Sequence, residues 1–261
     1  MRFQRFSGFL SRPRKVLAKP VAQWFLTSKG QQLEQMEREL LEPQLKRHFG
    51  SYILYYNPPV TMAAAPNVRH LVTLGDQALD VELQCLEHKW PVTADAVDVV
   101  VLQHSLDFAQ SPHDVLREAA HCVRPGGHLI IIGAHAWSFF GLQRLLTRGV
   151  WKHAYCLPPA RIVDWLGVLG FSLEKRCFAA YRPLLKSTTL QNKLAWLERL
   201  GGRKKAPVGG CYMLVARKMV HGMHAQSDSM QLDMQKLRPN VVAAHTPHSK
   251  NIKHNSEEHD R

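Results

Sequence analysis

Apolar residues between positions 97 and 133 form two continuous runs separated by an amphipathic stretch, a pattern that predicts two buried strands joined by a helix. The runs are Val97–Leu102 and His128–Ile132, and β-branched runs of this kind are typical of strands buried on both faces of a sheet. Ser111 and Pro112 have the residue types that open a helix, and Gly126–Gly127 reverse the chain after it. Because the crossover is helical, the two strands should lie parallel.

Apolar spacing elsewhere predicts a covering helix and further strands. Leucines and Met36 recur at three- and four-residue intervals over residues 27–48, which predicts an amphipathic helix on one face of the sheet. Pro43 is expected to kink this helix or to split it in two. Shorter apolar runs predict strands at 51–56, 70–74 and 81–85, a helix from Pro159 through Leu169, and two antiparallel strands at 172–180 and 210–216.

The composition is that of one globular domain with extensions. With 261 residues and 45% apolar content, the chain can bury one core of ordinary domain size. No apolar run reaches the ~20 residues that cross a bilayer, so no transmembrane segment is expected. The five cysteines include no Cys-x-x-Cys pair, so neither a metal centre nor a disulfide framework is expected. We therefore expect a cytoplasmic protein with reduced thiols.

The net charge of +13 is unevenly distributed along the chain. Residues 1–23 are rich in Arg and lack acids, so we expect a disordered basic arm before a domain at 24–220. Residues 221–261 carry six histidines without hydrophobic periodicity, which predicts a disordered polar tail. The segment Lys175–Lys218 carries eleven Lys or Arg and one acid. It predicts either a surface for an acidic partner or a solvated face without a ligand.

Two short segments at strand ends carry a family resemblance. The segment 102–108 reads Leu-Gln-His-Ser-Leu-Asp-Phe, and residues 137–141 read Trp-Ser-Phe-Phe-Gly. With the run at 97–133, they resemble class I S-adenosylmethionine-dependent methyltransferases, in particular the bacterial methyltransferase type 11 group, over residues 24–219. The resemblance implies an α/β fold: a Rossmann-like three-layer sandwich with a mostly parallel seven-stranded sheet and an antiparallel last strand. It also implies S-adenosyl-L-methionine as cofactor and methyl transfer as the reaction.

The chain departs from that family at the turn after the first strand. Asn57-Pro58-Pro59 stands where the resemblance predicts a Gly-x-Gly turn. Proline lacks an N–H and adds bulk at the closest backbone approach to a cofactor. Three outcomes stay open: cofactor binding through a modified loop that includes Asn57, a different ligand, or a site that binds nothing.

Four further residues are predicted to contact the cofactor. Asp76 follows the second strand, where nucleotide-binding α/β proteins place an acid against ribose hydroxyls, although Gly-Asp is also an ordinary turn pair. The resemblance places Glu87 near the adenine amino group, and a polar loop is the alternative. Gln103 and His104 follow the fourth strand at the ligand-binding edge of the sheet. A neutral His104 could accept a proton or orient a ligand, or it could be satisfied by neighbouring backbone.

An aromatic and imidazole-rich stretch after the fifth strand could close over a flat substrate. Its candidate substrate residues are His135, Trp137, Trp151 and Tyr155, and ordinary core packing is the alternative. The methyl acceptor could be a small molecule or RNA. Two other functions stay open: an inactive methyltransferase-like scaffold, and a module that binds RNA or an anionic surface through its basic segments.

Overall fold

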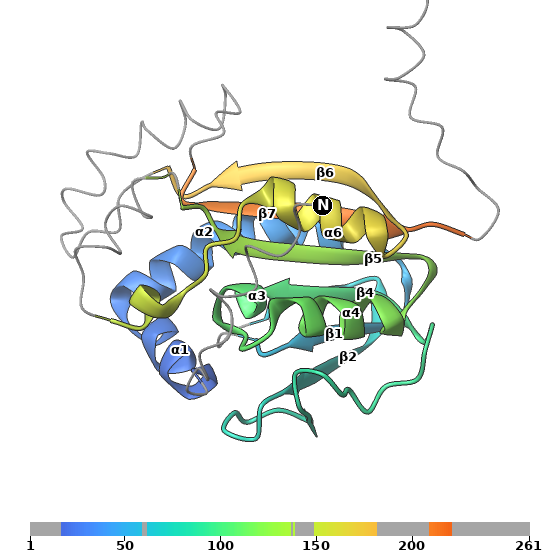
Figure 1. The fold of residues 1–261 in the computed structure, drawn as a ribbon, viewed down its shortest axis with the longest axis horizontal. Helices are drawn as coiled ribbons and strands as arrows, with labels where there is room; N and C mark the ends of the chain where they lie inside the picture. Colours follow the sequence, from blue (N-terminus) through green and yellow to red (C-terminus); the bar gives the residue numbers. More distant parts are fainter. Residues whose placement is uncertain (1–16, 59–61, 137, 139–148, 182–208, 221–261) are drawn as a thin grey trace, which may run out of the picture. The chain divides into compact units, whose positions relative to one another are not determined.

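The computed structural model describes residues 17–58, 62–136, 138, 149–181 and 209–220. Its helices and strands follow one another as an α/β chain (Figure 1). The order is α1 (Ala18–Phe25), α2 (Ser28–Leu45), β1 (Gly50–Tyr56), β2 (Val68–Gly75), β3 (Leu83–Gln84), β4 (Val97–Gln103), α3 (Ser105–Phe108), α4 (Pro112–Cys122), β5 (Val123–Ala134), the 3-10 helix η2 (Val150–His153), α6 (Pro159–Val168), β6 (Phe171–Ala179) and β7 (Cys211–Lys218).

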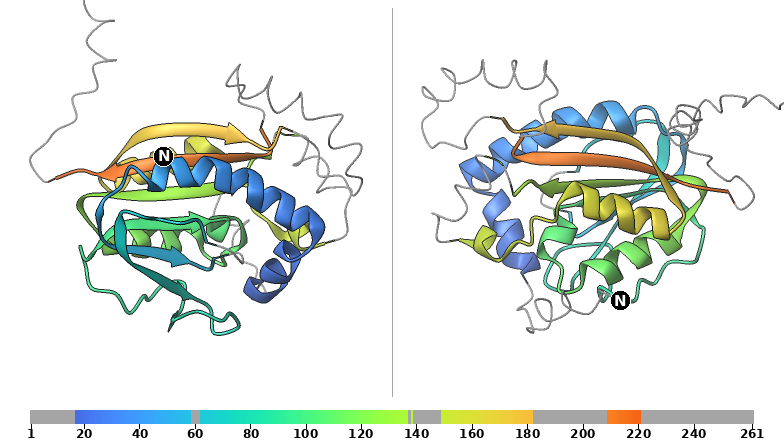
Figure 2. Two further views of the ribbon diagram at one scale, coloured as in Figure 1. Left: turned by 180° about the vertical axis from the view of Figure 1, so that it is seen from behind. Right: turned by 45° about the horizontal axis from the view of Figure 1, so that its top comes forward.

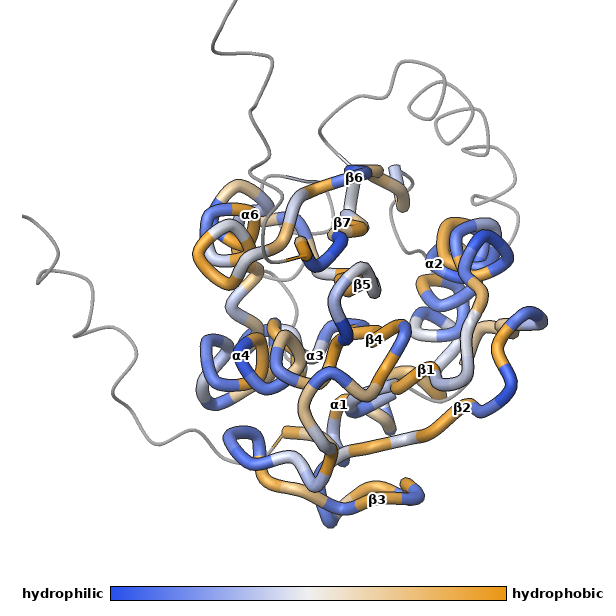
Figure 3. The backbone as a smooth tube through the Cα atoms, turned by 90° about the vertical axis from the view of Figure 1, so that its right-hand side faces the viewer, coloured by the Kyte–Doolittle hydropathy of each residue, from blue (hydrophilic) through white to orange (hydrophobic). Residues whose placement is uncertain are grey.

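The strands form one seven-stranded sheet in the order β3-β2-β1-β4-β5-β7-β6. The pairs among β1 to β5 are parallel, and β7 runs antiparallel to both β5 and β6. Helices α4 and α6 lie on one side of the sheet and α2 on the other (Figures 2 and 3). The predicted three-layer fold with an antiparallel last strand is therefore confirmed.

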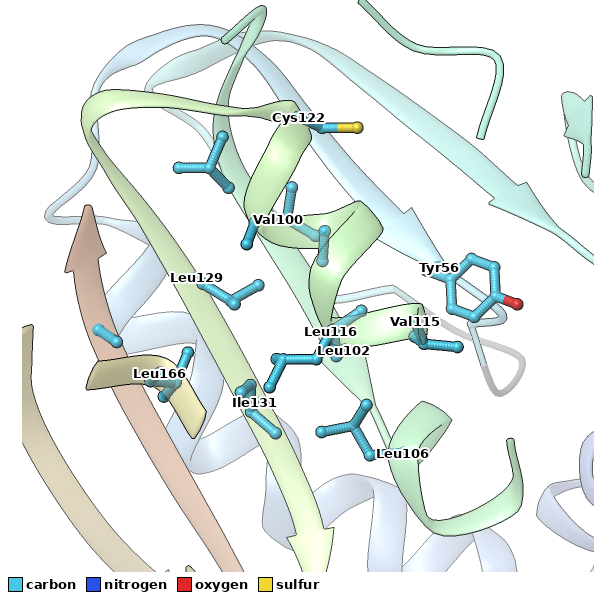
Figure 4. Packing of buried hydrophobic residues seen from close by; sticks show 14 of the residues in the cluster. Tyr56, Val100, Leu102, Leu106, Val115, Leu116, Cys122, Leu129, Ile131 and Leu166 are labelled. Atoms are coloured by element: carbon cyan, nitrogen blue, oxygen red, sulfur yellow. The ribbon is translucent and has the colours of Figure 1, made fainter. Parts of the chain in front are cut away.

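Strand β4 is buried throughout because each of its faces meets a different apolar layer. Val100 and Leu102 pack with Leu116 of α4 (Figure 4). Val99 and Val101 instead join the cluster that contains Leu41 and Leu45 of α2. Successive side chains of a strand point to opposite faces, so a continuous apolar run is what a central strand between two helical layers requires.

Several element boundaries differ from the prediction. Helix α2 is continuous from Ser28 to Leu45, because Pro43 lies in its last turn and interrupts the hydrogen bonding only there. Strand β5 begins at Val123, which pairs with Val97 before a register shift, so the turn at Gly126–Gly127 lies within the strand. Strand β3 contains two residues rather than five.

The last part of the predicted basic arm is helical rather than disordered. Residues 18–23 belong to helix α1, because Val21 and Trp24 pack against an apolar cluster that contains Phe25 and Trp151. The remainder of the predicted arm (1–16), the polar tail at 221–261 and most of the basic segment Lys175–Lys218 lie outside the described residues.

Candidate cofactor site

A cavity of about 390 Å³ lies at the carboxyl ends of β1, β2 and β4. This volume is within the range of small-molecule sites, ~300–1,000 Å³. The chain runs from β1 outward to β2 on one side and returns to β4 on the other, and the crevice at such a reversal of strand order is where open α/β sheets bind ligands. The cavity lining includes all five predicted cofactor residues: Asn57, Asp76, Glu87, Gln103 and His104.

The turn after β1 keeps a left-handed backbone without a glycine. Asn57 has φ of 45°, a region that Asn tolerates better than most residues. Its N–H donates to the carbonyl of Leu74 at 2.8 Å, and its Oδ1 accepts from the N–H of Asp76 at 2.9 Å. Asn57 thus supports a left-handed turn and joins the turns after β1 and β2.

Asp76 forms an ordinary turn and also lines the cavity, the two possibilities that its sequence position left open. Its Oδ1 accepts from the N–H of Ala78 at 2.8 Å, which is the hydrogen bond of an ordinary Asx turn. The residue is only half-buried and lines the cavity. The turn orients the carboxylate, and its position permits contact with ligand hydroxyls.

The carboxylate of Glu87 is bound to the backbone before α4. Its oxygens accept from the N–H of Gln110 at 2.8 and 2.9 Å and from the N–H of Ser111 at 3.0 Å. An anion at a helix N-terminus satisfies orphan amides and complements the helix dipole. The adjacent Trp90 is buried and stacks on Tyr56 with ring centroids 4.6 Å apart, so it packs on the core.

Gln103 and His104 are both bonded to Glu37 of α2, a residue that the sequence interpretation missed. The Nε2 of Gln103 donates to Glu37 Oε2 at 2.7 Å, and His104 Nε2 lies 2.5 Å from Glu37 Oε1. Glu37 occupies the same apolar stripe as Leu33 and Leu41, four residues away on either side. An acid at a core-facing helical position was the signal that could have revealed it.

The second ring nitrogen of His104 is also bonded to a carboxylate. His104 Nδ1 lies 2.9 Å from Asp107 Oδ2, and the same oxygen accepts from the N–H of Ala134 at 2.8 Å. The side chains of Glu37, His104 and Asp107 are 0–1% exposed. We refer to these three residues as the carboxylate–imidazole cluster.

The surroundings of His104 favour its protonated form. Burial alone would lower its pKa, but the charge of Glu37 and the hydrogen bonds to Asp107 and Glu37 raise the pKa of His104 to about 10. In the protonated form both ring nitrogens donate to carboxylates, so neither has a lone pair for an incoming proton. This geometry favours the alternative role of His104, orienting neighbouring groups, over its predicted role as a neutral proton acceptor, and both stay predictions.

The predicted substrate residues do not gather around the cavity. Trp151 is 4% exposed and packs edge-on against His104, with ring centroids 5.1 Å apart. His135 lies against Phe178, and burial lowers its pKa. The N–H of Tyr155 donates to the carbonyl of Asp107 at 2.8 Å. None of the three is among the residues that line the cavity, and Trp137 lies outside the described part of the chain.

Helix α1 supplies part of the cavity wall instead. Leu17, Ala18, Val21 and Ala22 line it, although the sequence interpretation placed them in a disordered arm. Other apolar residues, such as Leu79, Leu86 and Phe108, line the cavity as well. The lining therefore combines apolar side chains with the polar residues at the strand ends, as is usual for small-molecule sites.

Three further observations concern the predicted basic surface, membrane spans and metal sites. Lys218, at the end of the predicted basic surface, donates to the carbonyls of Ala120 and Val123 and pairs with Asp95 at 2.8 Å, so it holds β7 to the end of α4. Over the ranges that the structure describes, no helix is long and apolar enough to span a membrane. The same ranges contain no group of three His, Cys, Asp or Glu side chains placed to hold a metal ion.

Sheet order, the antiparallel β7 and a cavity over β1 and β4 define the chain as an α/β protein of Rossmann-like topology with a cavity at the carboxyl edge of its sheet. Residues 49–131 match the family model described as a methyltransferase domain. Over this segment, and in its fold, the chain is similar to class I S-adenosylmethionine-dependent methyltransferases.

Curated relatives match about half of this chain. The uncharacterized protein YafS of Escherichia coli (strain K12) is 30% identical over 146 residues, 53% of this chain and 59% of that protein. A ubiquinone biosynthesis O-methyltransferase of Xanthomonas axonopodis pv. citri is 28% identical over 141 residues, 49% of this chain and 59% of that protein. The chain thus spans less than two thirds of the length of these relatives.

Solved structures share the fold at low sequence identity. A Thermotoga maritima protein described as a possible histamine N-methyltransferase aligns with a TM-score of 0.52 and 13% identity, covering 78% of this chain and 98% of that one. A putative methyltransferase in complex with the Trm112 activator of Haloferax volcanii aligns with a TM-score of 0.50 and 14% identity, covering 80% and 100%. At such identity the likeness concerns the fold.

Proposed function

We propose that this protein binds S-adenosylmethionine in the cavity over β1, β2 and β4 and transfers its methyl group to an acceptor. One observation carries the proposal: the turns after β1 and β2, the loop after β3 and the end of β4 converge on one cavity of small-molecule size. The match of residues 49–131 to a methyltransferase domain supports the same reaction.

The residues around the cavity suit this cofactor chemically. Asp76 presents a half-buried carboxylate that can accept hydrogen bonds from ribose hydroxyls. Gln103 is 5% exposed and its amide nitrogen is held by Glu37, which fixes the orientation of the whole amide. The apolar wall from α1 can exclude water from the reacting groups.

Little covalent help from the protein is needed. When bound, the cofactor supplies a methyl group on a positively charged sulfur, which is already a good leaving group. The protein's residues hold the cofactor, orient it and exclude water, and this positioning lowers the barrier. The lack of a free base at His104 is compatible with such a mechanism.

Isothermal titration calorimetry with S-adenosylmethionine and with its demethylated product tests the proposal. We expect both ligands to bind the wild-type chain, and Asp76→Ala to weaken both. No heat of binding at about millimolar ligand, a concentration that detects ~−4 kcal/mol, would refute the cofactor proposal. It would favour an inactive methyltransferase-like scaffold. An assay of labelled methyl transfer into cell extract then separates small-molecule acceptors from RNA.

A further inference from the structure

The geometry points to a charge selector in this site: the carboxylate–imidazole cluster holds a net negative charge beside the cavity and favours a cationic cofactor over its neutral product. This inference rests on the proposed function. It assigns Glu37 and Asp107, which lie behind the cavity-lining residues Gln103 and His104, to cofactor specificity.

The hydrogen bonds determine the charge of the cluster. One imidazole lies between two carboxylates, with a ring nitrogen on each at 2.5 and 2.9 Å. A single proton beyond the neutral ring satisfies both bonds. Two carboxylates and one such proton leave a net charge of −1, whichever of the three groups carries the proton.

Within the described ranges, no Lys or Arg pairs with the two carboxylates of this cluster. The remaining hydrogen bonds to the two carboxylates come from neutral donors, the amide of Gln103 and the N–H of Ala134. The Oδ1 of Asp107 is buried and accepts no hydrogen bond, so part of the negative charge has no local partner.

Solvent screens this charge only weakly. The three side chains are at most 1% exposed, and the rings of Phe25 and Trp151 lie 5.7 and 5.1 Å from that of His104. In such surroundings the electrostatic field of a charge extends much further than it does in water. Gln103 and His104 separate the cluster's carboxylates from the cavity, so the electrostatic field of the cluster acts on a ligand bound there.

The two ligands of the proposed reaction differ chiefly in charge. S-Adenosylmethionine carries a sulfonium, and the product left after methyl transfer carries a neutral thioether with the same adenosine and amino-acid groups. A fixed negative charge therefore stabilises the bound substrate more than the bound product. Such a difference favours exchange of spent product for fresh cofactor.

Asp107→Asn is the sharpest perturbation. An asparagine oxygen in place of Oδ2 can keep both hydrogen bonds, and its NH2 group replaces an oxygen that has no partner. At about pH 6, Glu37 keeps the imidazole protonated, so the variant cluster is neutral. Glu39→Gln is the matched control, because Glu39 is exposed on the same helix and loses the same charge.

The measurement is the ratio of the two dissociation constants, product over S-adenosylmethionine, by calorimetry. We expect Asp107→Asn to lower this ratio by about threefold or more, and Glu39→Gln to leave it unchanged. If Asp107→Asn does not fold, Glu37→Gln takes its place with the same expectation. A folded variant with a ratio within about 1.5-fold of wild type would overturn the inference alone. Wild-type protein that binds neither ligand would remove the proposed function and this inference together.

Discussion

The side chain of Asn57 and the backbone of Gly75 occupy adjacent space at the turns after β1 and β2, and a double-mutant cycle can measure their coupling. A Cβ added at Gly75 would overlap with Asn57 Oδ1. Gly75→Ala alone should therefore cost about 1–3 kcal/mol of unfolding free energy, as overpacking does. Asn57→Gly loses the bond to Asp76, about 1–3 kcal/mol, but relieves left-handed strain of about 1 kcal/mol.

In the double variant the overlap disappears. The nearest remaining Asn57 atom is the backbone nitrogen, 3.4 Å from the added Cβ, which is a tolerable contact. Gly75→Ala should then cost less than about 0.5 kcal/mol, so the coupling energy is about 1–3 kcal/mol. Urea unfolding of the wild type, both single variants and the double variant measures it. Gly167→Ala on α6, where nothing lies within 4 Å of an added Cβ, is the additive control. If the changes in unfolding free energy for Gly75→Ala and Asn57→Gly are additive, the two residues do not occupy adjacent space as described.

Three further predictions concern charged and titratable groups. The pKa of His104 is raised to about 10, so its stabilising contribution is complete below pH 6.5 and is lost as the pH rises towards 10. Urea midpoints should fall more steeply with rising pH in wild type than in His104→Gln, and equal slopes would contradict the assignment. Burial, and then the neighbouring His128, lower the pKa of His48 to about 4. Stability should therefore fall as the pH drops from 6.5 towards 4, and His48→Gln should flatten that dependence. Glu87→Ala should cost about 1–2 kcal/mol in urea unfolding, because the Gln110 and Ser111 amides lose their acceptor. Glu87→Gln should cost less. An unchanged unfolding free energy in Glu87→Ala would contradict a stabilising role for these hydrogen bonds.

The central fold could be predicted because its signals are local. The continuous apolar run of β4 requires burial on both faces, and a helical crossover to β5 permits only a parallel pair. Strand β3 was harder to predict because it is a two-residue edge strand whose Leu83 is 38% exposed. At an edge, hydrophobic patterning constrains the backbone less than at the centre of a sheet.

The candidate site was predicted only where position along the chain determines position in space. Residues at the carboxyl ends of parallel strands, such as Asp76 and Gln103, meet at one edge whatever their side chains do. The partner of His104 could not be found in this way, because Glu37 lies 67 positions earlier in the sequence and reaches the cluster only through helix packing. Trp151 shows the converse: an aromatic next to candidate site residues packs in the core.

Placement of β7 between β5 and β6 affects how the chain is made. Both neighbours precede it in the sequence, and β6 ends at Ala179, whereas β7 begins at Cys211. During synthesis, β5 and β6 therefore leave the ribosome with unpaired hydrogen-bonding edges. These edges stay unpaired until β7 has been translated. Unpaired edges in a nascent chain are sites of aggregation and of chaperone recognition. A chain terminated before residue 211 would keep those edges open permanently. We expect it to be insoluble, although the described cavity-lining residues have all been translated by then.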